Sequence, residues 1–186
     1  VEDPPVAVGR PVDVPPGIPG NLAVAPLRQL APLHVEDVEA VAEDSVWAVA
    51  GGELFLYSDG TVDQVPILEE RATGIRRVAS GPQGRLWVAT VSALFAIDGD
   101  STTRYPVQEV WAIEFASSGT VWGATWGNGL FQISGGTARR VETVGEVPSQ
   151  IAALERDHSG QLWAGSVFET GLIRLRRRLF HTIKEP

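Results

Sequence analysis

Cysteine and methionine are both absent from this chain of 186 residues. Without cysteine there is no disulfide framework, no thiol nucleophile and no thiolate metal site. The absence leaves the compartment open, because secreted and cytosolic domains can both lack cysteine. Since the chain opens on Val1 and has no methionine, we expect it to be a processed or excised piece of a longer protein, so missing targeting signals carry no information.

Basic residues are also scarce, with 15 Lys and Arg against 23 Asp and Glu and a net charge of -8. A nucleic-acid partner would need a basic face, so nucleic acid is not expected to bind. No apolar run approaches the roughly 18 residues of a membrane span, and we expect no membrane insertion within this segment. The hydrophobic content of 44% is enough for a packed core.

Histidine occurs only as His34, His158 and His181, and no pair has the spacing of metal ligands. No serine can be placed with a histidine and an acid as a catalytic triad. The acids of 98–101 lack the number and spacing of a calcium loop. We therefore predict no catalytic residues, no metal site and no cofactor.

A short phrase around tryptophan is present four times. The copies are Gly-Arg-Leu-Trp-Val-Ala-Thr at 84–90, Gly-Thr-Val-Trp-Gly-Ala-Thr at 119–125, Gly-Gln-Leu-Trp-Ala-Gly-Ser at 160–166 and a shortened Ser-Val-Trp-Ala-Val-Ala at 45–50. The tryptophans, Trp47, Trp87, Trp122 and Trp163, lie 40, 35 and 41 residues apart. Such a period indicates a repeat architecture.

Each unit contains four short apolar stretches separated by glycine turns, without helical periodicity. Four short strands joined by hairpins are typical of a propeller blade. We predict an all-β fold, a β-propeller or partial propeller of four-stranded antiparallel blades, over residues 35–186. The expected blades are 35–66, 72–106, 108–143 and 148–183.

Residues 1–34 differ in composition, because they hold eight of the 13 prolines. Proline is confined to edges, turns and extended segments. This segment is therefore expected to be a linker around the domain or a set of strands that helps to close it.

The four repeated tryptophans are expected to be structural. A tryptophan on the second strand of a blade is large enough to fill the wedge between neighbouring blades. The small residues that follow it are expected to let the next blade approach; they are Ala48, Ala89, Gly123, Ala164 and Gly165.

The fourth unit reads Asp-His-Ser-Gly-Gln-Leu-Trp-Ala-Gly-Ser at 157–166 and Thr-Gly-Leu-Ile-Arg-Leu at 170–175. It resembles the two-component regulator propeller repeat, and the resemblance covers roughly residues 35–183. The resemblance implies an extracytoplasmic sensing or scaffolding domain, periplasmic or extracellular, of a signalling protein. Propellers of that family commonly have seven blades, so further blades or self-association are expected to complete a ring.

Two tryptophans break the repeat. Trp111 begins an inner strand where other units have Arg76 and Ala152, and Trp126 lies in a loop between second and third strands. With Glu109 and Asn128 nearby, they are expected to form an aromatic platform with polar edges, suited to a sugar or an aromatic ligand. Arg76 is a further candidate ligand-binding residue. Alternatively, Trp111 fills the channel and Trp126 packs on a neighbouring loop.

These observations favour a non-enzymatic sensor, ligand-binding or protein-interaction module with a small molecule, a carbohydrate or a protein as partner. An alternative is a propeller enzyme, such as a lyase, hydrolase or quinoprotein, with its site at the channel mouth. A purely structural scaffold is the third interpretation.

Overall fold

The computed structural model describes residues 30, 33–42, 44–66, 74–142, 147–168 and 171–175. Within these ranges the strands form four antiparallel sheets in chain order, with one short 3-10 turn at Pro82–Gly84. The first sheet comprises β1 (Val35–Ala42), β2 (Ser45–Ala50), β3 (Glu53–Ser58) and β4 (Thr61–Gln64), and the second β5 (Ile75–Ser80), β6 (Leu86–Thr90), β7 (Leu94–Asp98) and β8 (Ser101–Tyr105). The third comprises β9 (Val110–Phe115), β10 (Val121–Thr125), β11 (Leu130–Ser134) and β12 (Thr137–Arg140), and the fourth β13 (Ile151–Arg156), β14 (Leu162–Ser166) and β15 (Leu172–Leu175).

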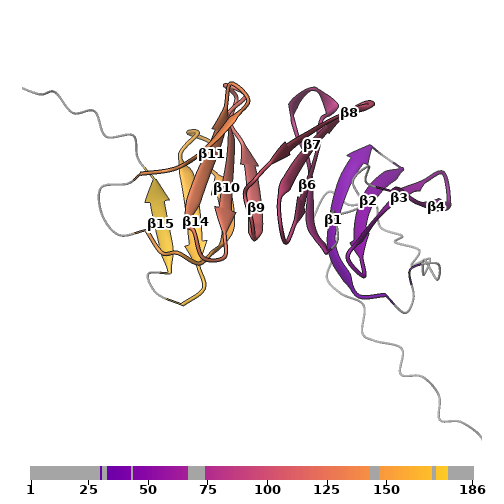
Figure 1. Ribbon diagram of the computed structural model, residues 1–186, viewed down its shortest axis with the longest axis horizontal. Helices are drawn as coiled ribbons and strands as arrows, with labels where there is room; N and C mark the ends of the chain where they lie inside the picture. The colour runs from indigo at the N-terminus through magenta and orange to yellow at the C-terminus, as the bar shows by residue number, and fades with distance from the viewer. Residues whose placement is uncertain are drawn as a thin grey trace, which may run out of the picture.

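The four sheets are propeller blades, and the expected all-β fold is confirmed. They follow one another from the indigo first sheet at one end of the molecule to the yellow fourth sheet at the other (Figure 1). Their first strands, β1, β5, β9 and β13, contact one another in succession and form the inner side of the arc. Residues 176–183 of the expected fourth blade lie outside the described residues, as do residues 1–29, 31 and 32 of the proline-rich segment. None of the described elements is a helix with the length and hydropathy needed to cross a membrane.

The outer hairpins depend on residues that accept a left-handed backbone. Asp59 and Gly60 join β3 to β4 with φ angles of 51° and 81°, and Gly135 and Gly136 join β11 to β12 at 56° and 75°. Tight two-residue hairpins need positive φ at both central positions. Asp-Gly and Gly-Gly therefore set the register in which the more polar outer strand pairs.

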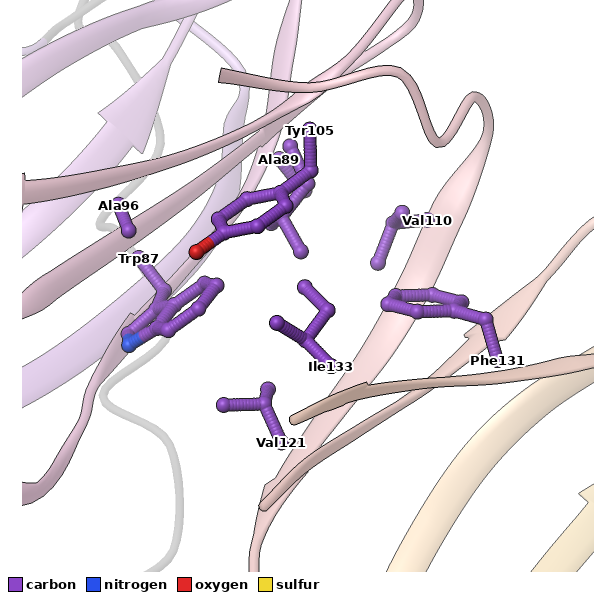
Figure 2. Packing of buried hydrophobic residues seen from close by; sticks show 9 residues of the cluster. Trp87, Ala89, Ala96, Tyr105, Val110, Val121, Phe131 and Ile133 are labelled. Atoms are coloured by element: carbon purple, nitrogen blue, oxygen red, sulfur yellow. The ribbon is translucent and has the colours of Figure 1, made fainter. Parts of the chain in front are cut away.

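The largest core lies between the second and third blades. Trp87 of β6 is 3% exposed and stacks on Tyr105 with ring centroids 5.6 Å apart. Val121, Phe131 and Ile133 of the third blade face these rings (Figure 2). Burial of an aromatic pair in such a junction contributes through both apolar area and ring geometry, so this tryptophan holds two blades together.

The other repeated tryptophans occupy the same register but are less enclosed. Trp47 packs at the junction of the first and second blades, and Trp122 at that of the third and fourth. Trp163 lies on the last blade, half-exposed, with the Arg174 guanidinium 5.4 Å from its ring centroid. Trp87 is thus the fully buried member of the four, whereas Trp47, Trp122 and Trp163 are all partly buried.

One small residue has a different role from the one expected. A Cβ on Gly123 would lie 2.0 Å from the Phe131 ring, which belongs to the paired strand of the same blade. Gly123 therefore makes room for Phe131 rather than for the next blade. The reason is strand alternation, because the residue directly after the tryptophan points to the opposite face of the sheet.

Asp157 explains the acid at the start of the fourth unit's phrase. Its Oδ1 accepts hydrogen bonds from the backbone N–H groups of Ser159 and Gln161, both at 2.9 Å. Its Oδ2 accepts the Trp163 Nε1–H bond at 2.9 Å. These bonds, with that from the Ser159 hydroxyl first, lower the pKa of Asp157 to about 2. One carboxylate thus closes the turn and orients the tryptophan.

Candidate functional site

Every inner strand carries a bulge near its start. The residue skipped by the pairing is Glu36 in β1, Arg76 in β5, Trp111 in β9 and Ala152 in β13. A bulge leaves one residue unpaired and re-aims its side chain. Arg76 and Trp111 therefore occupy equivalent positions on neighbouring blades, at the end where the second strand runs into its loop.

Trp126 is held by the loop that follows β10. The buried Thr125 hydroxyl donates to the Gly129 carbonyl at 2.9 Å and accepts the Asn128 N–H at 3.0 Å. The Trp126 N–H donates to the Glu109 carbonyl at 2.9 Å. Thr90 makes the equivalent hydroxyl bond to the Ala93 carbonyl at 3.0 Å. The hydroxyl of the threonine that ends the repeated phrase thus closes the following loop and fixes the position of the next residue.

Three aromatic rings from two blades line up on this face, and we call Trp111, Trp126 and Phe168 the aromatic row. Trp111 and Trp126 are stacked, with centroids 4.7 Å apart and planes at 30°. Phe168 meets Trp126 edge-on, with centroids 5.8 Å apart and planes at 76°. The Arg76 guanidinium lies 6.0 Å from the centroid of Trp111, at the limit of a cation–π contact.

The two tryptophans of the expected aromatic platform stack on each other. Because the indoles stack on each other, each covers one face of its partner. The accessible ring is Phe168, which is 70% exposed and stands nearly perpendicular to Trp126. The row therefore offers a corner with two aromatic walls.

Glu109 connects the loop face across two blades. Its N–H donates to the Val91 carbonyl at 3.2 Å, and its own carbonyl accepts from Trp126. Its φ is 52°, in the left-handed region, where the second blade has Gly74 at 71°. Such a conformation costs a non-glycine residue about 1 kcal/mol or more.

Arg77 holds the backbone of Trp111 in place. Its Nε donates to the Trp111 carbonyl at 2.9 Å, and one terminal nitrogen donates to the Glu36 carbonyl at 3.0 Å. Asp37 lies 3.8 Å from the same guanidinium. Arg77 therefore joins the inner strands of three consecutive blades beneath the row.

Asn128 lines a space that the aromatic row does not reach. Its side chain helps to line a cavity of about 320 Å³ formed also by Pro106, Val107, Gln108 and Arg140, and none of the three aromatic residues lines this space. Among the residues that the structure describes, no group of three His, Asp or Glu side chains could hold a metal ion.

The sequence did not point to Phe168 or Arg77 as parts of this site, or to the loop-closing hydrogen bonds of Thr125. At the position of Phe168 the second blade has Ser92 and the third has Gly127. This departure from the repeat is the sequence feature that could have identified Phe168. The buried indole N–H of Trp111 has no acceptor among the described residues.

Comparison with known proteins gives the fold and not the family. No known family model matches the chain, and no curated protein matches it. The extracellular domain of a candidate one-component system from B. thetaiotaomicron is 15% identical over 77% of this chain and 24% of that domain, with a TM-score of 0.63. A catalytically inactive virginiamycin B lyase from Staphylococcus aureus is 14% identical over 78% of this chain and 56% of the lyase, with a TM-score of 0.61.

The WD40 propeller domain of Doa1 gives the same result, at 17% identity over 75% of this chain and 49% of that domain, with a TM-score of 0.61. These proteins differ in what they do and share the propeller architecture. The chain spans about a quarter of the extracellular domain and about half of the other two structures.

Proposed function

We propose that this chain is a non-enzymatic ligand-binding module, the propeller part of a sensor protein that acts outside the cytoplasm. The observation that carries the proposal is the aromatic row. Its three residues differ from those at the same positions of the other units, and residues of the repeat, such as Thr125, place them on one face. The resemblance of the fourth unit to two-component regulator repeats supports the sensor role. The fold shared with an extracellular domain of a one-component system supports it at the level of architecture.

The row favours a ligand with a flat apolar ring and a polar periphery, which describes both sugars and substituted aromatics. Phe168 and the edge of Trp126 supply the two walls of the corner. Arg76 and Glu109 supply charges of both signs beside the row, and both are at least partly exposed. Small-ligand sites combine such apolar surfaces with a few polar groups that fix orientation.

The experiment is a binding screen of the whole chain against a glycan array and an aromatic fragment set, followed by calorimetry on each hit. Phe168→Ala and Trp126→Ala are each expected to weaken binding about tenfold, since an aromatic contact contributes about 0.5–1.5 kcal/mol beyond area burial. Tyr57→Ala, an aromatic residue of β3 outside the row, is the control and is expected to leave affinity unchanged.

A hit whose affinity is the same in both row variants would exclude this site. Binding only on the glycan array would identify a sugar ligand, and binding only in the fragment set an aromatic one. If neither set binds, the small-ligand proposal is wrong and the exposed row is better explained as a protein contact.

A further inference from the structure

The cavity that Asn128 lines lies at the junction between the second and third blades. Residues 106–108 of the connection from β8 to β9 line it, together with the loop after β10 and residues of β11 and β12. None of its lining residues belongs to an inner strand. The connection from β8 to β9 has only four residues, 106–109, against ten at 65–74 and ten at 141–150. The cavity thus lies toward the outer strands, at the junction with the short connection.

A glycine shapes the cavity from beneath. Gly123, directly after the repeated tryptophan, stands where the other units have Ala48, Val88 and Ala164. A Cβ at Gly123 would overlap the Phe131 ring, so the ring lies closer to the strand than any of these residues would allow. Phe131 lines the cavity from this position.

The side chain of Arg140 is directed to the same side of the sheet. Arg140 pairs with Phe131, and directly paired residues project to the same face. Phe131 belongs to the core between the second and third blades (Figure 2), so Arg140 projects toward that junction, at its exposed edge. Arg139 also lines the cavity, but strand alternation directs its side chain to the other face. Arg140 is therefore the cation that a bound molecule would meet.

The loop of the third blade brings a carboxamide to the cavity. Four residues, 126–129, separate Thr125 from the leucine of β11, whereas three, 91–93, separate the equivalent residues of the second blade. The Asn128 N–H donates to the buried Thr125 hydroxyl at 3.0 Å. The backbone of Asn128 is thus fixed beside the cavity.

The polar side chains of the lining suit an anion. The carboxamides of Gln108 and Asn128 and the guanidinium of Arg140 can all donate hydrogen bonds. The lining residues, all within the described part of the chain, include no Asp or Glu, although the chain has a net charge of -8. A guanidinium binds a carboxylate or a phosphate through two parallel hydrogen bonds. Of the apolar lining residues, Pro106 is exposed and Val107 half-buried, so both are accessible to a bound molecule.

We propose that this cavity binds a small organic anion with an apolar body, either a carboxylate or a phosphate ester. The anionic group is bound by the Arg140 guanidinium and by the carboxamides of Gln108 and Asn128. The apolar body lies against Pro106 and Val107. The volume of about 320 Å³ is within the range of about 300–1,000 Å³ typical of small-molecule sites. The aromatic row does not line the cavity, so the proposal does not depend on the ligand of that row.

The test is calorimetric titration of the full chain with four probes, namely 3-phenylpropionate, its uncharged amide, phenyl phosphate and inorganic phosphate. At least one of the two organic anions is expected to bind. The amide lacks the charge and inorganic phosphate lacks the apolar body, so each is expected to bind about tenfold more weakly or less. Binding of one organic anion and not the other would support the proposal and identify the anionic group.

Arg140→Gln is the variant that tests the cavity. It is expected to weaken binding of the organic anion about tenfold, because a charged hydrogen-bond donor is lost. Arg104→Gln is the matched control, since Arg104 pairs with Phe95 in the same register of the second blade and does not line the cavity. Affinity is expected to be unchanged in this control. Both arginines are exposed, so thermal unfolding is expected to be unaltered in either variant.

Backbone NMR shifts locate the bound anion. Shifts at 106–108 and 139–140 are expected, and shifts confined to Trp111, Trp126 and Phe168 would place the anion at the aromatic row and overturn the proposal. Equal affinity for the acid and its amide, or for phenyl phosphate and inorganic phosphate, would also overturn it. Equal weakening by Arg140→Gln and Arg104→Gln would mean general attraction to basic residues and no site in the cavity. Absence of binding of both organic anions at millimolar concentration would exclude the cavity as an anion site.

Discussion

Trp87 and Trp126 are the same residue type in two regions of the molecule, a junction between blades and the loop face. Trp87 is enclosed by two blades and stacks on Tyr105. Trp126 is half-exposed. Among the described residues, its aromatic neighbours are Trp111 and Phe168, the other two members of the row. Residues that follow the repeat therefore build the junctions, and residues that depart from it build the aromatic row on the loop face.

The comparison also separates two kinds of constraint. At a junction the side chain must fit a fixed volume, so stability records any change. At the loop face hydrogen bonds fix the backbone of the residue, while its side chain remains partly exposed. The same substitution should therefore have a large effect on unfolding in one region and mainly an effect on binding in the other.

The largest expected effect comes from Trp87→Ala. Removal of this ring leaves a cavity between the second and third blades, which is expected to lower the free energy of unfolding by about 3–5 kcal/mol. Trp126→Ala, the matched change at the loop face, is expected to lower it by no more than about 2 kcal/mol. Urea unfolding of both variants measures the difference, and equal losses would remove the distinction between the two regions.

A smaller effect is expected from Gly123→Ala. The added Cβ would overlap the Phe131 ring, so the free energy of unfolding is expected to fall by about 1–3 kcal/mol. Gly165→Ala is the control, because its Cβ would be in ordinary contact with Ala153 at 3.4 Å. Thermal unfolding compares the two, and a stable Gly123→Ala variant would mean that Phe131 can move aside.

Arg77→Ala tests how the junctions position the row. It removes the bonds to the Trp111 and Glu36 carbonyls, each worth about 1.5–3 kcal/mol because the donor is charged. Ligand affinity is expected to fall with stability, since the Trp111 backbone loses its support. Arg76→Ala is the contrasting variant and is expected to leave unfolding unchanged while it weakens ligand binding; calorimetry with urea unfolding separates the two outcomes.

The smallest effect concerns pH and the Asp157 turn. Because the folded pKa is lowered to about 2 from the ordinary 3.8, the ionised carboxylate stabilises the fold above pH 3.8. That contribution is lost as the pH falls from 3.8 through about 2. Asp157→Asn is expected to flatten the stability profile in this window only, and NMR titration of the carboxyl group checks the pKa directly. A titration midpoint near 3.8 would contradict the bonding described for the turn.

The repeat made the fold predictable. Strand-length apolar stretches, glycine turns and a tryptophan at a fixed place in each unit report directly on blade geometry, and the units fold as separate antiparallel sheets. The strand and loop positions of Trp111 and Trp126 could also be predicted, because alignment with the other units shows where each departs from the repeat. The stacking of the two indoles could not be predicted, since ring orientation depends on the bulge and on the loop closed by Thr125.

Phe168 and Arg77 show the remaining limit. An exposed phenylalanine in a loop has no periodic signal, and its contact with Trp126 crosses from one blade to the next. Arg77 bonds to backbone carbonyls on two other blades, which a pattern of side-chain types does not encode. Interactions between units were thus harder to predict than the units themselves.

The backbone of Glu109 has a consequence for the loop face. Its N–H is bonded to the loop of the second blade through Val91, and its carbonyl to the loop of the third through Trp126. Because one residue makes both bonds, the two loops are tied to each other by main-chain atoms, and a side-chain substitution at this position would leave that tie in place.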